Sequence, residues 1–509
     1  MRDYGYVSDL EYVHNYNIGN SPMHMSLATK IQGQKVSLPE EPNYLELGFG
    51  QGLSLNVHAA ANKGQFWGND FNPAQTANAR ELAEISGAPV ELTDESFAEI
   101  AARDDLPEFD VIVLHGIWTW ISHENREIIR DLVRRKLKIG GMMYVSYNAM
   151  PGWAASTPMR HLIREFGTRE SSGALPNRLQ DALAFSNSLK SANANYFKAN
   201  PEVWQRWEQN VETQDKRYLA HEYLNENWDI FFFSEVADYL ADAKLTFAAS
   251  GHLLDLVDTI HITKEGQELL AKVQDPVLRQ TIRDYLTNQQ FRRDIYVKGE
   301  RKMSSKEHES AMRDQLFVLT SQPKDLPKTI VGSLGEGKLN PDIYEPIISA
   351  LDSDKARPKT LGELMIKKGV KDLRISQVVQ ALTILTSLEK IAPAQHDEIA
   401  AHVEPQTKRL NEALCERAET SKDVAYLASP RMGAGVRVDR IEQLFLRAAS
   451  LKKPDPVAWV WSIFEQNNEK LLQDGKAITA KSDNIKRLRT LYSDFESDRL
   501  PMFKRIGIT

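Results

Sequence analysis

The sequence predicts an α/β fold with a mostly parallel sheet, followed by mainly α-helical regions, and three observations predict it. Between residues 44 and 149, short apolar runs alternate with helical stretches, as βαβ units require. The first apolar run is followed by three glycines at alternate positions, Gly48, Gly50 and Gly52, which is typical of a tight turn from a buried strand into a helix. Residues 401–509 show only helical periodicity.

Five strands are expected in the α/β region, at residues 44–47, 65–70, 89–93, 109–114 and 142–149. The fourth is a continuous apolar run, as strands buried on both faces require. Ligands of open parallel sheets bind beyond the carboxyl ends of the strands. Four such ends form the predicted binding edge here: Gly48 to Gly52, Asp70, His115-Gly116 and Tyr147-Asn148.

The glycine spacing disfavours two common phosphate sites. A dinucleotide fingerprint needs a glycine where Leu53 stands, and a P-loop needs a Lys-Ser/Thr pair that does not follow Gly52. What remains is an acidic-x-Gly-x-Gly-x-Gly pattern, with Glu46 as the acid and Asp70 after the second strand. Glu46 can oppose an ammonium group, and Asp70 can accept hydrogen bonds from both hydroxyls of a ribose.

This pattern resembles motif I of the class I S-adenosylmethionine (SAM) methyltransferases, whose catalytic domain is Rossmann-like. The resemblance implies SAM as the cofactor and S-adenosylhomocysteine (AdoHcy) as the product. It also places the residues after the third strand beside the adenine. The residues predicted to bind the cofactor are Glu46, Gly48, Gly50, Gly52, Asp70, Phe71, Asn72, Asp94, Ser96, Phe97, His115 and Gly116.

Several longer segments resemble one bacterial group more closely. LELGFGQG, GNDFNPAQ, HGIWTWI, LKIGG and SYNAMPGW are similar to segments of proteins that join a class I methyltransferase domain to a methyltransferase regulatory domain. HEYLNENWDIFFF, from His221, is similar to the start of that second domain. The group includes protein-lysine methyltransferases that modify a bacterial outer-membrane protein. The resemblance therefore implies N-methylation of lysine side chains in a surface or outer-membrane protein. Phe49 and Ile139 depart from the group's pattern without removing a polar group that the cofactor needs.

Lysine methylation requires a neutral amine held close to the methyl group, so the acceptor side should desolvate the amine and orient it. Aromatic walls would also bind a methylated product by cation–π contact. The predicted walls are Trp118, Trp153 and Tyr223, and the predicted catalytic residues are Tyr147, Asn148, His221 and Glu222. Asn148 can accept from the amine through its side-chain oxygen, and a nearby His or Glu can orient the amine or relay its proton.

The residues leave other acceptors open. Enzymes that methylate nucleobases or glutamine usually have an (Asn/Asp)-Pro-Pro-(Tyr/Phe) turn after the fourth strand, and His-Gly-Ile-Trp at residues 115–118 disfavours such acceptors. Two alternatives remain: a small-molecule or glycan O-methyltransferase, and a SAM-binding regulatory protein with weak catalysis. No metal is expected, because no carboxylate cluster is placed for a cation.

Composition and charge are those of a soluble globular protein, with 42% hydrophobic and 26% charged residues among 509. The net charge of -7 and a pI near 6.0 argue against nucleic acid as a partner. A single cysteine, Cys415, excludes an internal disulfide framework. The first residues lack a signal-peptide pattern and no long apolar run follows, so a cytoplasmic location without membrane insertion is expected.

Five regions are predicted along the chain. They are a leader or lid at 1–43, a SAM-binding domain at 44–200, a regulatory-type domain at 201–300, a winged-helix-like domain at 301–400 and a helical domain at 401–509. For the leader, packing against the sheet is favoured over a lid. In the winged-helix-like region, the expected exposed side chains of the third helix offer little charge to phosphates, so contact with protein is predicted. These are Ser376, Gln377, Gln380 and Thr383. A homodimer is a further prediction.

Overall fold

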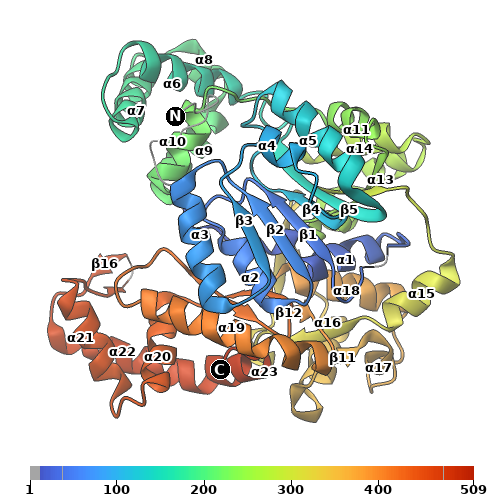
Figure 1. Cartoon of the computed structure of the whole chain (residues 1–509), viewed down its shortest axis with the longest axis vertical. Helices are drawn as coiled ribbons and strands as arrows, with labels where there is room; N and C mark the ends of the chain where they lie inside the picture. The colour runs from blue at the N-terminus through green and yellow to red at the C-terminus, as the bar shows by residue number, and fades with distance from the viewer. Residues whose placement is uncertain (1–11, 37, 474) are drawn as a thin grey trace.

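A seven-stranded sheet of order β3-β2-β1-β4-β5-β7-β6 lies at the centre of the computed structural model, which describes residues 12–36, 38–473 and 475–509 (Figure 1). The strands are β1 (Asn43–Leu47), β2 (Gln65–Asn69), β3 (Val90–Thr93), β4 (Phe109–Leu114), β5 (Leu137–Asn148), β6 (Leu245–Ser250) and β7 (Phe291–Lys298). Only β7 is antiparallel to its neighbours. The predicted Rossmann-like α/β fold with a mostly parallel sheet is confirmed.

Helices cover both faces of this sheet, because alternate residues of each strand point to opposite faces. In β4, Val111 and Val113 enter one hydrophobic core, and Ile112 and Leu114 enter the other. The helices around the sheet are α1 (Pro22–Ile31), α2 (Leu53–Ala61), α3 (Pro73–Ser86), α4 (Phe97–Ala102), α5 (His123–Lys136), α11 (Phe233–Ala241), α12 (Asp258–His261), α13 (Lys264–Ala271) and α14 (Pro276–Thr287). Short 3-10 turns lie at η1 (Ile18–Asn20) and η2 (Leu253–Leu256).

A helical insertion separates β5 from the last two strands of the sheet. It contains α6 (Thr157–Arg169), α7 (Leu175–Ser191), α8 (Asn195–Ala199), α9 (Pro201–Thr213) and α10 (Lys216–Leu224), which gather at one end of the molecule (Figure 1). Trp204 and Trp207 help to form a separate core for these helices. β6 and β7, from the region predicted to be regulatory, complete the sheet at its β5 edge. The domain boundaries stay predictions.

Two small sheets and several helices follow between residues 300 and 396. The elements are α15 (Ser305–Arg313), β8 (Leu316–Leu319), η3 (Pro323–Asp325), β9 (Thr329–Gly332), β10 (Gly335–Lys338), α16 (Pro341–Asp352), η4 (Asp354–Ala356), β11 (Lys359–Thr360), α17 (Leu361–Met365), α18 (Ile375–Ser387) and β12 (Ile391–Pro393). Strands β11, β8 and β12 pair into one sheet, and β9 pairs with β10. Thr383 of α18 is buried, which corrects the prediction that it is exposed. Gln380 donates to the hydroxyl of Thr259 at 3.2 Å, so α18 contacts the segment after β6.

The C-terminal part is mainly helical, as predicted, but it also contains two hairpins that helical periodicity did not predict. Strands of two to four residues are too short to show a period in the sequence. The elements are α19 (Asp397–Arg417), β13 (Tyr426–Ser429), β14 (Ala434–Arg437), α20 (Arg440–Ser450), α21 (Pro456–Gln466), β15 (Leu472–Gln473), β16 (Lys476–Ala477), α22 (Lys481–Asp494), the π-helical η5 (Phe495–Arg499) and α23 (Leu500–Arg505). Among the described residues, no helix has the length and apolar character needed to cross a membrane.

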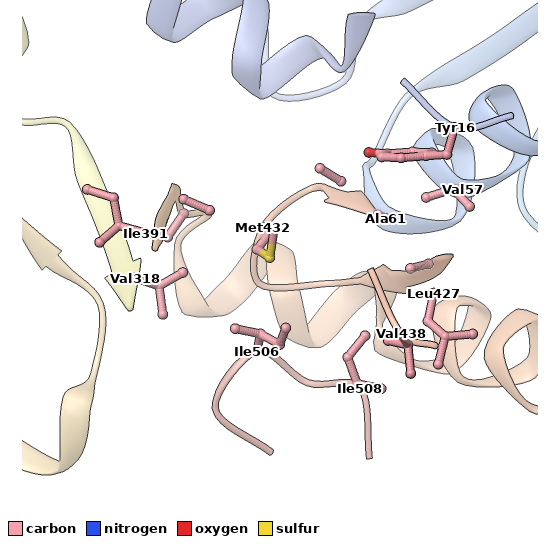
Figure 2. Packing of buried hydrophobic residues seen from close by; sticks show 14 of the residues in the cluster. Tyr16, Val57, Ala61, Val318, Ile391, Leu427, Met432, Val438, Ile506 and Ile508 are labelled. Atoms are coloured by element: carbon pink, nitrogen blue, oxygen red, sulfur yellow. The ribbon is translucent and has the colours of Figure 1, made fainter. Parts of the chain in front are cut away.

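Every residue of α2 is buried, because the sheet covers one side of it and the C-terminal part covers the other. Figure 2 shows Val57 and Ala61 of α2 packed near Leu427 and Met432 of the hairpin region. A hydrogen bond also crosses this contact, because the side-chain amide of Gln395 donates to the backbone carbonyl of Ala61 at 2.8 Å. The C-terminal part is therefore fixed directly to the helix that follows the glycine turn.

Candidate functional site

Two cavities meet at the carboxyl ends of the strands. The smaller, of about 360 Å³, lies over β1, β2 and the turn after β4, and the larger, of about 1080 Å³, lies beside β5 and α10. The residues that line both are Tyr12, Val13, Asn15, His115, Gly116 and Trp120. The smaller is lined by nine of the residues predicted to bind the cofactor: Glu46, Gly48, Gly50, Asp70, Phe71, Ser96, Phe97, His115 and Gly116. We therefore call the two the cofactor cavity and the acceptor cavity.

The turn after β1 has a left-handed backbone at each of its three glycines. Gly48 faces the cofactor cavity with φ of +70°, and a Cβ there would lie 3.1 Å from carbons of Ile117. Gly52 caps α2, and a Cβ there would lie 2.4 Å from the Cβ of Ala79. Gly48 thus keeps the cavity open, whereas Gly52 lets α2 and α3 approach each other.

Gly52→Ala is expected to destabilise the protein by about 2–5 kcal/mol, because strain at positive φ adds to overpacking against α3. Gly140→Ala is the matched control, since its φ is +84° but nothing lies within 4 Å of the added Cβ. Gly140→Ala should lower the free energy of unfolding by only about 1–2 kcal/mol. Chemical denaturation of both variants measures the difference, and equal losses would contradict the packing role of Gly52.

Glu46 has the environment that a bound ammonium would need. The side chain is 4% exposed, and burial raises the pKa of its carboxyl to about 8. Its hydrogen bond is a long one from the hydroxyl of Tyr44, at 3.5 Å, and no Lys or Arg of the described residues pairs with it. A buried carboxylate that lacks a cation fits the ammonium of the methionine part of SAM.

Asp70 follows β2 and bridges the glycine turn to α3. Its two carboxylate oxygens accept from the backbone amides of Gly50 at 2.9 Å and Asn72 at 3.0 Å. Burial raises the pKa of the Asp70 carboxyl to about 6. Asp70 lines the cofactor cavity, where the ribose contact was predicted. Asn72 instead caps α3 by accepting from the amide of Ala74.

Of the three residues predicted to lie beside the adenine, two line the cofactor cavity and one does not. Ser96 caps α4 and Phe97 begins it, and both line the cofactor cavity. Asp94 lies outside the cavity, is about half exposed, and faces Arg80 at 3.8 Å. Gly52, Asn72 and Asp94 are therefore the three predicted cofactor residues that do not line the cavity.

His115 stands between the two cavities as a neutral ring. Its Nδ1 lies 3.1 Å from the amide nitrogen of Asn17 and 3.1 Å from the hydroxyl of Ser146. An amide nitrogen can only donate, so Nδ1 accepts and the proton lies on Nε2. Burial, with help from the charge of Arg293, lowers the pKa of His115 to about 4. His115 can therefore donate one hydrogen bond but is a poor proton acceptor at neutral pH.

Asn148 and Glu222 form a fixed pair in the acceptor cavity. The Asn148 amide nitrogen donates to Glu222 Oε1 at 2.8 Å, so the amide oxygen of Asn148 is left as an acceptor. Glu222 also accepts from the indole nitrogens of Trp120 at 3.2 Å and Trp228 at 3.0 Å. Burial raises the pKa of the Glu222 carboxyl, while these donors and Arg160 oppose the rise. This network holds one orientation of the Asn148 side chain.

Three predicted substrate walls lie elsewhere, which corrects their prediction. Trp118 packs edge-on against Tyr239, and Tyr223 packs edge-on against Trp207, each within a hydrophobic cluster. Trp153 is also buried, and neither cavity is lined by any of the three. Their apolar rings are core residues, as most tryptophans and tyrosines of a sheet domain are.

Two predicted catalytic residues have contacts that favour a structural role. His221 is fully buried beneath Trp120 and Tyr12, and it does not line either cavity. Tyr147 contributes to the wall of the acceptor cavity, but its hydroxyl donates to Asp294 at 2.7 Å inside the protein. Residues 144, 146 and 148 share one face of β5, and residue 147 lies on the other.

Tyr147→Phe should therefore lower stability rather than turnover. Loss of the buried hydrogen bond to Asp294 is expected to cost about 1–2 kcal/mol of unfolding free energy. The methyl-transfer rate of the folded variant should stay within about twofold of wild type, since the hydroxyl is already bonded to Asp294. Thermal unfolding and initial rates at saturating SAM measure the two quantities, and a rate loss of tenfold or more would restore the catalytic role.

The sequence reasoning missed several residues of the site. From the leader, Tyr12 lines both cavities and Asn17 contacts His115, while Gln51 donates to the Tyr12 carbonyl at 3.1 Å. Other missed lining residues include Asn15, Trp120, Ser146, Arg293 and Lys422. Strand alternation from Asn148 could have found Ser146, but no local pattern distinguished Tyr12 or Asn17 within the leader. Residues 12–17 of the leader contribute to the walls of the cavities, and residues 1–11 lie outside the described structure.

The C-terminal part holds the leader in place. The Tyr16 hydroxyl accepts from the Gly435 amide at 2.5 Å, and the Tyr16 ring packs on Tyr426. His14 lies 3.0 Å from Arg417 and 3.4 Å from Asp423. The residues that connect the two cavities are therefore anchored by a region distant in sequence.

Comparison with known families gives two matches. Residues 45–141 match the model of a methyltransferase domain, and residues 215–298 match the model of a predicted methyltransferase regulatory domain. The second match includes β6 and β7, so the part of the chain that carries the regulatory name also completes the sheet.

Relatives and solved structures extend these matches to the whole chain. An uncharacterized protein of Synechocystis sp. is 38% identical over 508 residues, which cover 99% of both chains. An uncharacterized protein of Rickettsia prowazekii is 27% identical over 57% of this chain and 52% of its own length. The structure of PKMT2 from Rickettsia typhi in complex with AdoHcy shares the fold over 98% of this chain and 99% of that chain, with a TM-score of 0.68 and 18% identity. The chain belongs to the family of SAM-dependent methyltransferases that join a methyltransferase domain to a methyltransferase regulatory domain, and SAM is its cofactor.

Proposed function

We propose that this methyltransferase N-methylates lysine side chains of a protein. The observation that supports it is the Asn148 amide, whose nitrogen is held by Glu222 so that its oxygen remains an acceptor in a cavity adjoining the cofactor cavity. An amide oxygen accepts a hydrogen bond from a neutral amine and so points the lone pair of the amine away from itself. This is the orientation that attack on a methyl group requires.

The side chains around Asn148 suit an amine. SAM supplies a methyl group on a positively charged sulfur. Asn148 accepts one N–H of the amine, and Glu222 keeps the amide from rotating. Glu222 is a positioning residue in this scheme, because its carboxylate is already occupied by N–H donors of Trp120 and Trp228.

Aromatic rings at the junction of the cavities take the place of the walls predicted from sequence. Tyr12 and Trp120 line both cavities and pack edge-on, with ring centroids 6.0 Å apart. Such rings exclude water and favour a methylated ammonium by cation–π attraction. Desolvation also lowers the pKa of a lysine amine, which increases its neutral fraction.

The proposal is tested by incubating the protein with a lysate and SAM labelled in its methyl group, followed by a protein gel. Label in discrete protein bands is the expected result. Label only in small molecules would favour the O-methyltransferase alternative, and no label with intact AdoHcy binding would favour a regulatory SAM-binding protein.

We propose a surface or outer-membrane protein of a bacterium as the substrate and a cytoplasmic site of action, on the resemblance of the segments LELGFGQG and SYNAMPGW to the outer-membrane-protein lysine methyltransferases. A winged-helix-like unit at 301–400 is supported by the grouping of α16, α17 and α18 with a three-stranded sheet. Nucleic acid is disfavoured by the net charge of -7. A homodimer stays a prediction.

A further inference from the structure

The acids of the acceptor cavity are all compensated within the protein. Asp215 pairs with Arg217 at 2.9 Å, and Asp423 pairs with Arg417 at 2.6 Å. Glu222 accepts hydrogen bonds from three N–H donors. The oxygens of these carboxylates are therefore already engaged by donors of the protein itself.

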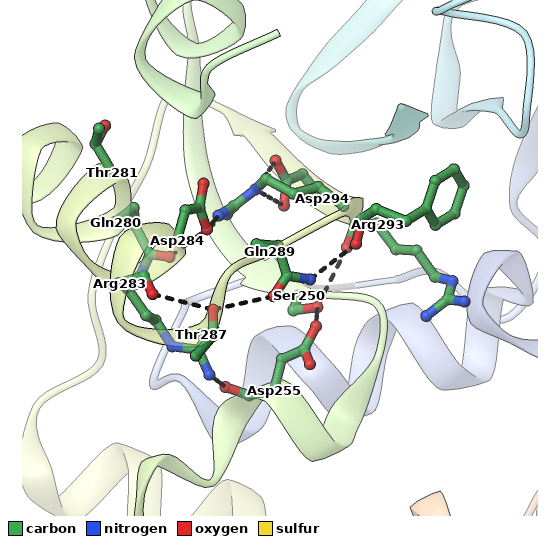
Figure 3. Close-up of polar contacts among 12 residues, drawn as sticks. Ser250, Asp255, Gln280, Thr281, Arg283, Asp284, Thr287, Gln289, Arg293 and Asp294 are labelled. Carbon is green, nitrogen blue, oxygen red and sulfur yellow. Dashed lines mark hydrogen bonds and ion pairs between the residues drawn. The ribbon is translucent and has the colours of Figure 1, made fainter. Parts of the chain in front are cut away.

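Two cations that line the same cavity have no such compensation. Neither the guanidinium of Arg293 nor the ammonium of Lys422 makes an ion pair or donates a hydrogen bond to any described residue. The Arg293 guanidinium lies over the Phe291 ring, 5.2 Å from its centroid. Figure 3 shows its side chain extending away from the polar network around Asp255, Arg283 and Asp294. Arg293 and Lys422 are thus cations of the acceptor cavity that keep their hydrogen-bonding capacity for a ligand.

The strand register explains why Arg293 faces the acceptor. Arg293 of β7 is the partner of Ser146 of β5, and directly paired residues project from the same face of a sheet. Ser146 contacts His115, and the charge of Arg293 acts on His115, so the guanidinium lies close to the junction of the cavities. Its neighbour Arg292 lies on the other face and is buried against Asp294 and Asp284.

We propose that Arg293 and Lys422 bind carboxylate side chains of the acceptor, so that the methylated segment is acidic around its target residue. The two cations come from different parts of the chain, Arg293 from β7 and Lys422 from the loop between α19 and β13. Arg293 forms a fork-like, bidentate pair with a carboxylate, and Lys422 contributes a more exposed point charge. That the target residue is a lysine rests on the proposed function, whereas the preference for acidic neighbours rests on the cavity alone.

Binding of two fluorescent peptides in the presence of AdoHcy tests this directly. Both contain one central lysine and have equal length, and the lysine is flanked by Asp and Glu in one and by Asn and Gln in the other. The acidic peptide should bind about tenfold more tightly, with an advantage that shrinks as salt rises. Arg293→Gln should weaken its binding about tenfold and Lys422→Gln about threefold, with little effect on the neutral peptide. Lys272→Gln, an exposed lysine outside both cavities, is the matched control and should bind both peptides like wild type.

Calorimetry of AdoHcy with Arg293→Gln separates the acceptor from the cofactor as the source of the carboxylate. AdoHcy affinity within about twofold of wild type supports the proposal, and a loss of tenfold or more would overturn it, because Arg293 would then bind the carboxylate of the cofactor. Equal binding of the two peptides by wild type would also overturn it. If the acidic peptide binds preferentially but its lysine is not methylated, the inference stands and lysine N-methylation fails.

Discussion

Asn148→Ala is expected to lower the methyl-transfer rate at saturating substrates by about a hundredfold, because the amine loses the acceptor that fixes its lone pair. AdoHcy affinity should stay within about twofold, since Asn148 lines the acceptor cavity and not the cofactor cavity. Single-turnover rates and calorimetry measure the two effects. A variant that loses AdoHcy binding, or that keeps its rate, would contradict the assignment.

Two companion variants sharpen this result. Glu222→Gln keeps the size of the side chain but lets Asn148 rotate, so the rate should fall about tenfold while AdoHcy affinity is unchanged. Asn187→Ala, an exposed position on α7, is the control and should match wild type. If Glu222→Gln lowered only the free energy of unfolding and left the methyl-transfer rate unchanged, Glu222 would have a structural role alone.

Glu46→Gln is expected to weaken AdoHcy binding by about a hundredfold at pH 8, because the amide cannot oppose an ammonium with full charge. Burial holds the pKa of the Glu46 carboxyl at about 8, so in the free protein it must lose a proton to pair with the ammonium. Wild-type affinity should therefore rise between pH 6 and about 8, and the variant should lack that rise. Glu81→Gln, exposed on α3, is the control. A flat pH profile for wild type would contradict the assignment.

Glu46→Gln should weaken AdoHcy binding but increase the free energy of unfolding of the ligand-free protein at high pH. The pKa of Glu46 lies above its ordinary value of 4.5, so the favourable contribution of this group is complete below about pH 4.5 and is lost as pH rises through about 8. Without ligand, Glu46→Gln should thus be about 2–4 kcal/mol more stable than wild type at pH 9, relative to the difference at pH 4.5. Denaturant titrations at the two pH values measure this, and an unchanged difference would show that Glu46 is not buried as a charge.

The cofactor side could be predicted from sequence because its chemistry lies in short, continuous segments. Gly48, Glu46 and Asp70 lie within one strand-turn-helix unit and the end of the next strand. Their roles follow from local backbone geometry, which neighbouring residues largely determine. Three predicted residues do not line the cavity. Gly52 packs against α3, while helix capping decides the contacts of Asn72 and solvent exposure those of Asp94.

The acceptor side could be predicted only in part because it is assembled from distant segments. Asn148 and Glu222 were found at a strand end and in a polar cluster, but Tyr12, Arg293 and Lys422 come from the leader, β7 and the C-terminal part. These residues come close together because β6 and β7 complete the sheet and because the C-terminal part packs against α2. No local sequence pattern indicates either arrangement. The aromatic residues predicted as substrate walls were misassigned for a related reason. The sequence alone does not show which aromatic rings are buried in a hydrophobic core.

The central claim is that the methyl group goes to the side-chain nitrogen of a protein lysine, and the fate of the label tests it most directly. Protein labelled with methyl-labelled SAM would be hydrolysed completely to amino acids and separated by chromatography. The label is expected to elute with N-methylated lysines and to resist mild base. Label in methylated arginine, glutamine or histidine, or label released by mild base as from a methyl ester, would contradict it.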